Sequence, residues 1–154
     1  MSNETGTIRL FLDRDEEAVV RVWHRAGQAE YTYLPTWQAF SLEQAAEVFR
    51  SAILGENQIW VGVGENEAIV AFMAINGTLI DRMYVDPEQQ RSGWGTRLLN
   101  HAKTLSPQML ELYTHQENVA ARAFYEKHGF KAISFGVSPP PESAPDVKYR
   151  WLAG

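Results

Sequence analysis

A short segment past the middle of the chain places two glycines at an expected junction between a strand and a helix. The segment is Gln90-Arg-Ser-Gly-Trp-Gly-Thr96; an apolar strand is expected before it, from Thr78 to Val85, and a helical pattern continues after it to Leu105. Glycines permit positive φ angles and a close approach of a ligand to the backbone. Free N–H groups and the positive end of a helix dipole at such a joint favour binding of a phosphate or pyrophosphate.

The same segment excludes two common phosphate-binding motifs. It lacks the G-x-x-x-x-G-K-[ST] pattern of a P-loop, and no third glycine follows Gly93 and Gly95 as a dinucleotide-binding fold requires. A tight turn without a ligand remains the alternative, so a second motif is needed to decide between them.

A second candidate segment opens on Asn118 and closes on Gly129-Phe130. On a helix, Asn118, Ala121 and Tyr125 share one face. Each has an ordinary explanation as well, since asparagine often caps a helix and tyrosine is often half-buried. The residues expected to face the sheet are Ala120, Ala123 and Phe124.

Together the two segments resemble the GNAT superfamily of acyl-CoA-dependent N-acetyltransferases. The family's pyrophosphate motif is [RQ]-x-x-G-x-[GA], and its three positions are filled here by Gln90, Gly93 and Gly95. The family's later motif, N-x-x-A-x-x-F-Y-x-x-x-G-F, is matched by Asn118, Ala121, Phe124, Tyr125, Gly129 and Phe130. The resemblance extends to the expected order of elements from Ile8 to Leu152.

The resemblance implies a role for each matched position. The amides from Gln90 to Thr96 would hold the CoA pyrophosphate, and acetyl-CoA would lie where the strands of Val85 and Leu112 splay apart. Asn118 would hydrogen-bond the pantetheine arm, and Tyr125 would be the general acid that protonates the departing thiolate. The residues expected at acetyl-CoA are Met83, Val85, Gln90, Arg91, Ser92, Gly93, Trp94, Gly95, Thr96, Asn118, Ala121 and Phe124.

The implied chemistry is attack of an amine on a thioester. A backbone N–H at Val85 could stabilise the oxyanion. The chain has no cysteine, so an acetyl-cysteine intermediate is excluded and direct attack in a ternary complex is the economical hypothesis. The general base stays open. Some family members place a glutamate where this chain has Leu79, so the candidates here are, in order, Asp81, His115 and Glu30.

The acceptor site of the family involves the first two helices, their connection and the last hairpin. Here those regions supply Tyr31, Tyr33, Trp37, Phe40 and the loop 139–145, and the residues expected at the substrate are Glu30, Tyr31 and Tyr33. The aromatic residues could line a pocket for an amine or form core beneath a loop. A small-molecule amine is favoured over a peptide N-terminus or a lysine side chain. A catalytically silent acyl-CoA sensor and a nucleotide-phosphate binder are the rival functions.

The elements that must position these residues follow from periodicity and turn residues. Strands are expected at 8–12, 58–64, 68–75, 78–85, 109–113, 130–137 and 146–152, and helices at 15–28, 96–105, 118–128 and from Ser41 onward, where Gln44 completes a capping box. Pro35 is expected to keep the segment before Ser41 out of a helix. The order β–α–α–β–β–β–α–β–α–β–β predicts a mixed α/β (α+β) sheet in one domain over residues 1–154.

Composition sets the remaining limits. The 154 residues are 45% hydrophobic and carry a net charge of −5, which disfavours nucleic-acid binding. No apolar run is long enough for a membrane span, and the polar start from Met1 to Thr7 shows no secretory signal, so the cytoplasm is the expected location. The scattered histidines indicate no metal site. A homodimer is left open, because the last strand could expose an edge.

Overall fold

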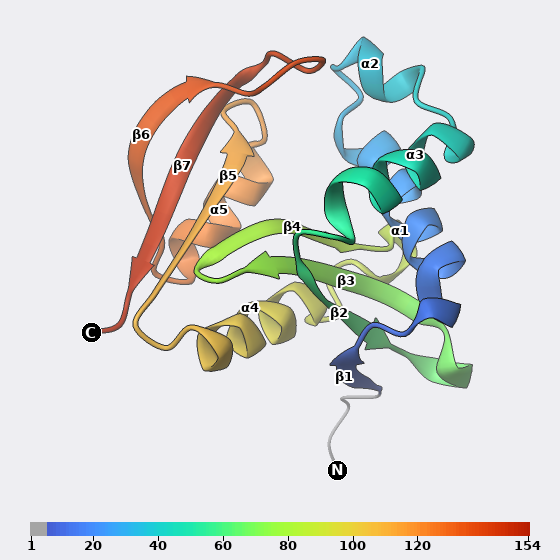
Figure 1. The fold of residues 1–154 in the computed structure, drawn as a ribbon. Coiled ribbons are helices and arrows are strands. Elements are labelled where there is room, and N and C mark those ends of the chain that lie inside the picture. The colour runs from blue at the N-terminus through green and yellow to red at the C-terminus, as the bar shows by residue number, and fades with distance from the viewer. Residues whose placement is uncertain (1–5) are drawn as a thin grey trace.

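The structure, a computed structural model, describes residues 6–154. Most of the start that was expected to carry no secretory signal, residues 1–5, lies outside the described residues. Residues 6–154 form a seven-stranded sheet with helices packed on both faces (Figure 1). This confirms the predicted mixed α/β fold. None of the helices within residues 6–154 is both long and apolar enough to cross a membrane.

The observed elements follow the predicted order, with one additional short helix. They are β1 (Thr7–Leu10), α1 (Glu16–Glu30), α2 (Pro35–Gln38), α3 (Leu42–Val48), β2 (Gln58–Val63), β3 (Ile69–Asn76), β4 (Leu79–Val85), α4 (Trp94–Leu105), β5 (Met109–His115), α5 (Val119–Lys127), β6 (Lys131–Val137) and β7 (Pro145–Leu152).

The strand order in the sheet is β1-β2-β3-β4-β5-β7-β6. β7 therefore lies inside the sheet, hydrogen-bonded to β5 on one side and β6 on the other. The expectation that the last strand exposes an edge is wrong, because the chain returns through β6 before β7 inserts between it and β5. The edge strands are β1 and β6, so the stated reason for a homodimer does not hold.

β4 and β5 run parallel and pair over a very short length. Their register consists of Leu79 opposite Glu111 and Ile80 opposite Leu112. On its other side, β4 carries a bulge, since Ile75 of β3 faces Ile80 and Ala74 faces Arg82, which leaves Asp81 as an extra residue. Past Ile80 the two strands diverge, and this opens the wedge that the resemblance implies.

Two clusters of buried side chains hold the helices to the sheet. On one face, α1 contributes Val19 and Trp23, which pack with Phe49 and Phe72. On the other face, Leu98 and Leu99 of α4 pack against residues of β5 and β7. The helical spacing of the apolar residues in α1 and α4 explains this arrangement, because it gives each helix one buried stripe.

Three local expectations have clear outcomes. The capping box is confirmed: Gln44 N donates to Ser41 Oγ at 3.0 Å, and Ser41 N donates to Gln44 Oε1 at 2.8 Å. Pro35 begins the short helix α2 instead of preventing it, because proline is compatible with the first helical position, whose N–H has no partner within the helix. The face of α5 that holds Ala120 and Ala123 is exposed, so its predicted contact with the sheet is wrong.

Candidate functional site

The loop before α4 has the geometry of an anion site. Gly93 caps α4 with φ of +84°. A Cβ built on it would meet no atom within 4 Å, so glycine is favoured at this position by its positive φ and not by a lack of space. Arg97 N donates to Gly93 O at 3.0 Å as the helical hydrogen bonds begin. The N–H groups of Trp94, Gly95 and Thr96 precede that bond and are free of the helical ladder.

The side chains of this loop divide between solvent and core. Gln90, Arg91 and Ser92 are exposed. Trp94 is buried against Gly62, where a Cβ would lie 2.8 Å from the indole ring, so Trp94 offers a ligand only its backbone. Gly95 admits the ring of Phe124, which would be 3.2 Å from a Cβ at that position.

The backbone of β4 presents free groups to the wedge. Asp86 N donates to Val70 O at 2.8 Å. Because bonded and non-bonded pairs alternate along an antiparallel ladder, the N–H and C=O groups of Met83 and Val85 point away from β3 and toward β5. Gln90 Nε2 confirms this direction, since it donates to Val85 O at 3.3 Å.

A small cavity of about 60 Å³ lies within the wedge. It is lined by twelve residues of α1, β4, β5 and α5, among them Glu30, Asp81, Met83, Tyr84, Ala121 and Tyr125. The Tyr125 hydroxyl makes no hydrogen bond to another residue within 6–154. Burial, reinforced by the nearby negative charge of Glu30, raises the pKa of Tyr125, so the phenol is protonated at neutral pH.

Asn118 links the start of α5 to the end of α1. Its Oδ1 accepts a hydrogen bond from Ala121 N at 3.1 Å, and its Nδ2 donates to Glu30 Oε1. Burial raises the pKa of Glu30, and the hydrogen bond from Asn118 partly opposes that shift. The amide of Asn118 thus positions a carboxylate beside Tyr125, and its role at pantetheine stays a prediction.

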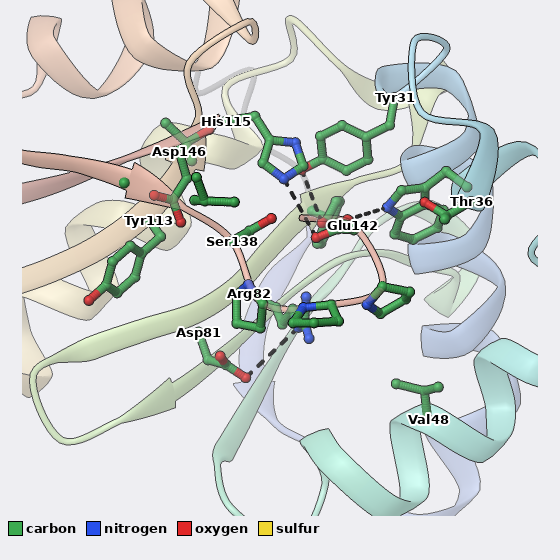
Figure 2. Close-up of a pocket in the computed structure, with 18 of the residues that line it drawn as sticks. Tyr31, Thr36, Val48, Asp81, Arg82, Tyr113, His115, Ser138, Glu142 and Asp146 are labelled. Atoms are coloured by element: carbon green, nitrogen blue, oxygen red, sulfur yellow. Dashed lines mark hydrogen bonds and ion pairs between the residues drawn. The ribbon is translucent and has the colours of Figure 1, made fainter. Parts of the chain in front are cut away.

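A larger cavity of about 750 Å³ adjoins the wedge (Figure 2). Tyr31, Tyr84 and Tyr113 line both cavities. The Tyr31 and Tyr84 hydroxyls lie 3.2 Å apart, and burial raises the pKa of Tyr84 to about 12. The aromatic walls of the larger cavity come from Trp23, Tyr31, Trp37 and Phe40. Trp23, Tyr31 and Trp37 also belong to the buried core. The two alternatives expected for the aromatic residues, a pocket wall and core beneath a loop, are therefore both true of Tyr31 and Trp37.

The loop between β6 and β7, residues 138–144, crosses this cavity toward α2 (Figure 1), and we call it the strap. Its ends are joined: Ser138 N donates to Ala144 O at 2.8 Å, and Ala144 N donates to Ser138 Oγ at 3.0 Å. At its tip, Glu142 accepts a hydrogen bond from Trp37 Nε1 at 2.8 Å and lies 3.5 Å from His115 Nε2. These contacts lower the pKa of the Glu142 carboxyl.

Glu142→Ala is expected to raise KM for the acceptor roughly 5- to 30-fold with little change in kcat, because the strap loses contacts with α2 and β5 that contribute about 1–2 kcal/mol. The lowered pKa of Glu142 places its stabilising contribution above the ordinary glutamate pKa, and this contribution is lost as the pH falls through the lowered value. Steady-state kinetics at neutral pH, with the exposed Glu65→Ala as control, measure the effect. An unchanged KM would show that the strap does not bound the acceptor site.

The two other candidate bases, Asp81 and His115, each contact a side chain other than Tyr125. Asp81 is exposed at the bulge, and its Oδ2 accepts a hydrogen bond from Asn57 Nδ2 at 3.1 Å. His115 is buried, and its Nδ1 lies 3.2 Å from the Tyr33 hydroxyl while its other nitrogen faces Glu142. Tyr33 lines neither cavity and reaches the site through His115.

Sequence reasoning did not single out Arg82, Tyr84 and Asp146 among the residues that line the larger cavity, and it included Glu142 only as part of the loop 139–145. Side chains alternate between the two faces of a strand, so placing Met83 and Val85 on one face of β4 would have placed Arg82 and Tyr84 together on the other. No local pattern marks Asp146, and nothing within the loop 139–145 distinguishes Glu142 from its neighbours. Within residues 6–154, no group of three or more His, Asp or Glu side chains is placed to hold a metal ion.

Comparison with known proteins decides the family. Residues 55–132 match the family model of the acetyltransferase (GNAT) domain. The chain belongs to the GNAT family. This confirms the resemblance, and the chain is an acyltransferase of a family whose acetyltransferases use acetyl-CoA.

Other GNAT proteins resemble the chain over most of its length. It is 32% identical over 124 residues to the peptidyl-lysine N-acetyltransferase YjaB of Salmonella typhimurium, covering 80% of this chain and 82% of that protein. The Escherichia coli YjaB is 31% identical over 125 residues, with coverages of 81% and 82%.

Solved GNAT structures support the fold. The solution structure of apo-form YjaB from Escherichia coli has a TM-score of 0.78 at 26% identity, covering 98% of this chain and 100% of that one. The PaiA N-acetyltransferase of Thermoplasma acidophilum, crystallised with coenzyme A, has a TM-score of 0.72 at 18% identity, with coverages of 97% and 99%. At that identity, the likeness supports the fold alone.

Proposed function

We propose that this GNAT domain, spanning residues 1–154, transfers an acetyl group from acetyl-CoA to the primary amine of a small molecule. The observation that carries the choice of acceptor is the strap, which crosses the larger cavity and is held to α2 through Glu142 and Trp37. A cavity of about 750 Å³ with such a cover suits a small ligand enclosed on several sides.

In the proposed reaction, the loop before α4 orients acetyl-CoA. Amides from Gln90 to Thr96 hold the pyrophosphate, and the backbone edge of Met83 and Val85 lies along pantetheine. The acetyl carbonyl then faces the wedge, where the Val85 N–H stabilises the oxyanion of the tetrahedral intermediate.

Glu30 and Tyr125 manage the protons in this proposal. As the amine nitrogen bonds to the carbonyl carbon, Glu30 accepts the proton that the amine loses. When the carbon–sulfur bond breaks, Tyr125 donates its proton to the thiolate. Both Glu30 and Asp81 line the wedge cavity with Tyr125, and Glu30 is preferred as the base because it is half-buried, whereas Asp81 is exposed and accepts a hydrogen bond from Asn57. A raised pKa also makes Glu30 a stronger base near neutral pH.

A lysine side chain on a protein is the second candidate acceptor. The names of the YjaB relatives favour it. A protein-borne lysine would have to pass beneath the strap. Measuring CoA release with small amines and with lysine-containing peptides separates the two candidates, since higher kcat/KM for the peptides would overturn the small-molecule proposal.

Acetyl-CoA is expected to raise the melting temperature, because ligand at 100 times Kd adds about 2.7 kcal/mol to the stability of the folded state. For a chain of this size the shift is roughly 5–10 °C. Thermal unfolding with acetyl-CoA, and with ATP in parallel, measures it. A shift with ATP and none with acetyl-CoA would contradict the assignment of the loop before α4.

A further inference from the structure

The larger cavity contains a guanidinium group whose hydrogen-bond donors are unused. Arg82 of β4 lines the cavity, its Nε is buried, and the side chain makes no hydrogen bond to any residue within 6–154. Asp81 Oδ2 lies 3.9 Å from that Nε, so the two side chains form a long ion pair, but the distance is too great for a hydrogen bond. The guanidinium carbon lies 5.6 Å from the ring of Trp23, which helps to fix the side chain.

The acidic side chains around the same cavity differ in whether they have hydrogen-bond or ion-pair partners. Glu142 is held by Trp37 and His115, and Asp81 accepts a hydrogen bond from Asn57. The carboxylate of Asp146 on β7 makes no ion pair or hydrogen bond to a residue within 6–154. Figure 2 shows Arg82 and Asp146 on different walls of one space. The cavity therefore offers its ligand a guanidinium whose hydrogen-bond donors have no partner within residues 6–154, and a carboxylate that is likewise without one.

We propose that the acceptor is an amino acid, that is, an amine that also carries a carboxylate. Arg82 binds the carboxylate, and the acidic side of the cavity attracts the ammonium group. This inference rests on the proposed function and narrows its substrate class. The planar guanidinium fork matches a carboxylate with two parallel hydrogen bonds, whereas a neutral carboxamide offers one weaker acceptor.

The position of Arg82 fits this binding mode. Arg82 and Tyr84 lie on the same face of β4, two residues apart, and hence about 7 Å apart along the strand. Tyr84 lines both the larger cavity and the wedge cavity. A carboxylate on Arg82 thus leaves the amine of the same molecule close to the wedge, where Glu30 and Tyr125 lie.

The test compares acceptors that differ only in the carboxylate. A panel of α-amino acids and their α-carboxamides is assayed by release of CoA thiol, with the wild type, Arg82→Gln and Arg21→Gln. Arg21 is an exposed arginine paired with Glu17, so its variant controls for the loss of one positive charge. The wild type and Arg21→Gln are expected to prefer the best acid over its amide by roughly 10- to 100-fold in kcat/KM, and Arg82→Gln to lose this preference through KM.

The outcomes separate this inference from the proposed function. Efficient acetylation of the amides with poor use of the acids, or a preference for the acids that Arg82→Gln leaves intact, would overturn the role of Arg82 while keeping the amine acetyltransferase. Failure of every small amine, with an intact acetyl-CoA shift, would overturn the proposed function itself. If Arg82→Gln does not fold, the ratio of acid to amide in the wild type decides the substrate class.

Discussion

Tyr125→Phe is expected to lower kcat by roughly 10²–10⁴ while acetyl-CoA still raises the melting temperature as in the wild type. The phenol lies in the wedge cavity, is free of hydrogen bonds to residues 6–154, and has a raised pKa that keeps it protonated. Removing its hydroxyl takes away the proton donor for the thiolate and leaves the ring contacts with Phe130 and Tyr149. Steady-state CoA release at saturating substrate measures the loss.

The matched control for this variant is Tyr113→Phe. Tyr113 also lines both cavities, but its side chain is 55% exposed and carries no role in the proposed mechanism. We expect a change of less than about threefold in kcat, since no proton transfer is removed. Equal losses in the two variants would mean that Tyr125 acts through the shape of the wedge and not as an acid.

Glu30→Gln is expected to lower kcat by a similar factor, roughly 10²–10⁴, because the amide cannot accept the proton of the amine. Glutamine retains the size of the side chain and an oxygen that can accept the hydrogen bond from Asn118. The cap of α5, and with it acetyl-CoA binding, is expected to persist. Single-turnover acetylation and the acetyl-CoA thermal shift measure the two properties separately.

The pH dependence adds a signature that a structural role would not give. Because burial raises the pKa of Glu30, the acidic limb of kcat/KM in the wild type is expected above the ordinary pKa of glutamate, and it should disappear in Glu30→Gln. A raised pKa also means that the stabilising contribution of Glu30 is present at low pH and is lost as the pH rises through that value. The variant should therefore unfold at no lower temperature than the wild type at neutral pH.

Asp81→Asn is the competing experiment. The sequence alone ranked Asp81 first as the base, and the structure finds it at the bulge with a hydrogen bond from Asn57. A large loss of kcat in Asp81→Asn, together with an active Glu30→Gln, would restore the sequence-based ranking and remove Glu30 from the mechanism.

Features that depend on neighbouring residues were predictable from the sequence. The capping box at Ser41 and the asparagine at the start of α5 satisfy backbone groups within a few residues of themselves, and Gly93 before α4 supplies a positive φ. Local steric and hydrogen-bonding rules determine such features. Position along the chain was therefore enough to locate them, and the family resemblance supplied the wedge.

Features that depend on distant contacts could not be predicted in this way. Asn118 meets Glu30, and Glu142 meets Trp37, because three helices and the strap converge on the open side of the sheet. The bulge at Asp81 arises because β4 has one residue more than β3 between two paired positions, and neither strand's own sequence indicates where that extra residue falls. The exposed face of α5 was misassigned because alanine suits both a buried and an exposed helix face.

The short pairing between β4 and β5 also bears on how the protein folds. The strands from β2 to β4 are joined by two successive hairpins, whereas β5 pairs with β7 from Met109–Leu152 to His115–Asp146. Contacts between sequence-distant residues form more slowly than local ones. We expect the loop before α4 to be fixed early and the walls around Asp146 to close last. Native-state hydrogen exchange should therefore detect two cooperative units that meet at Ile80 and Leu112.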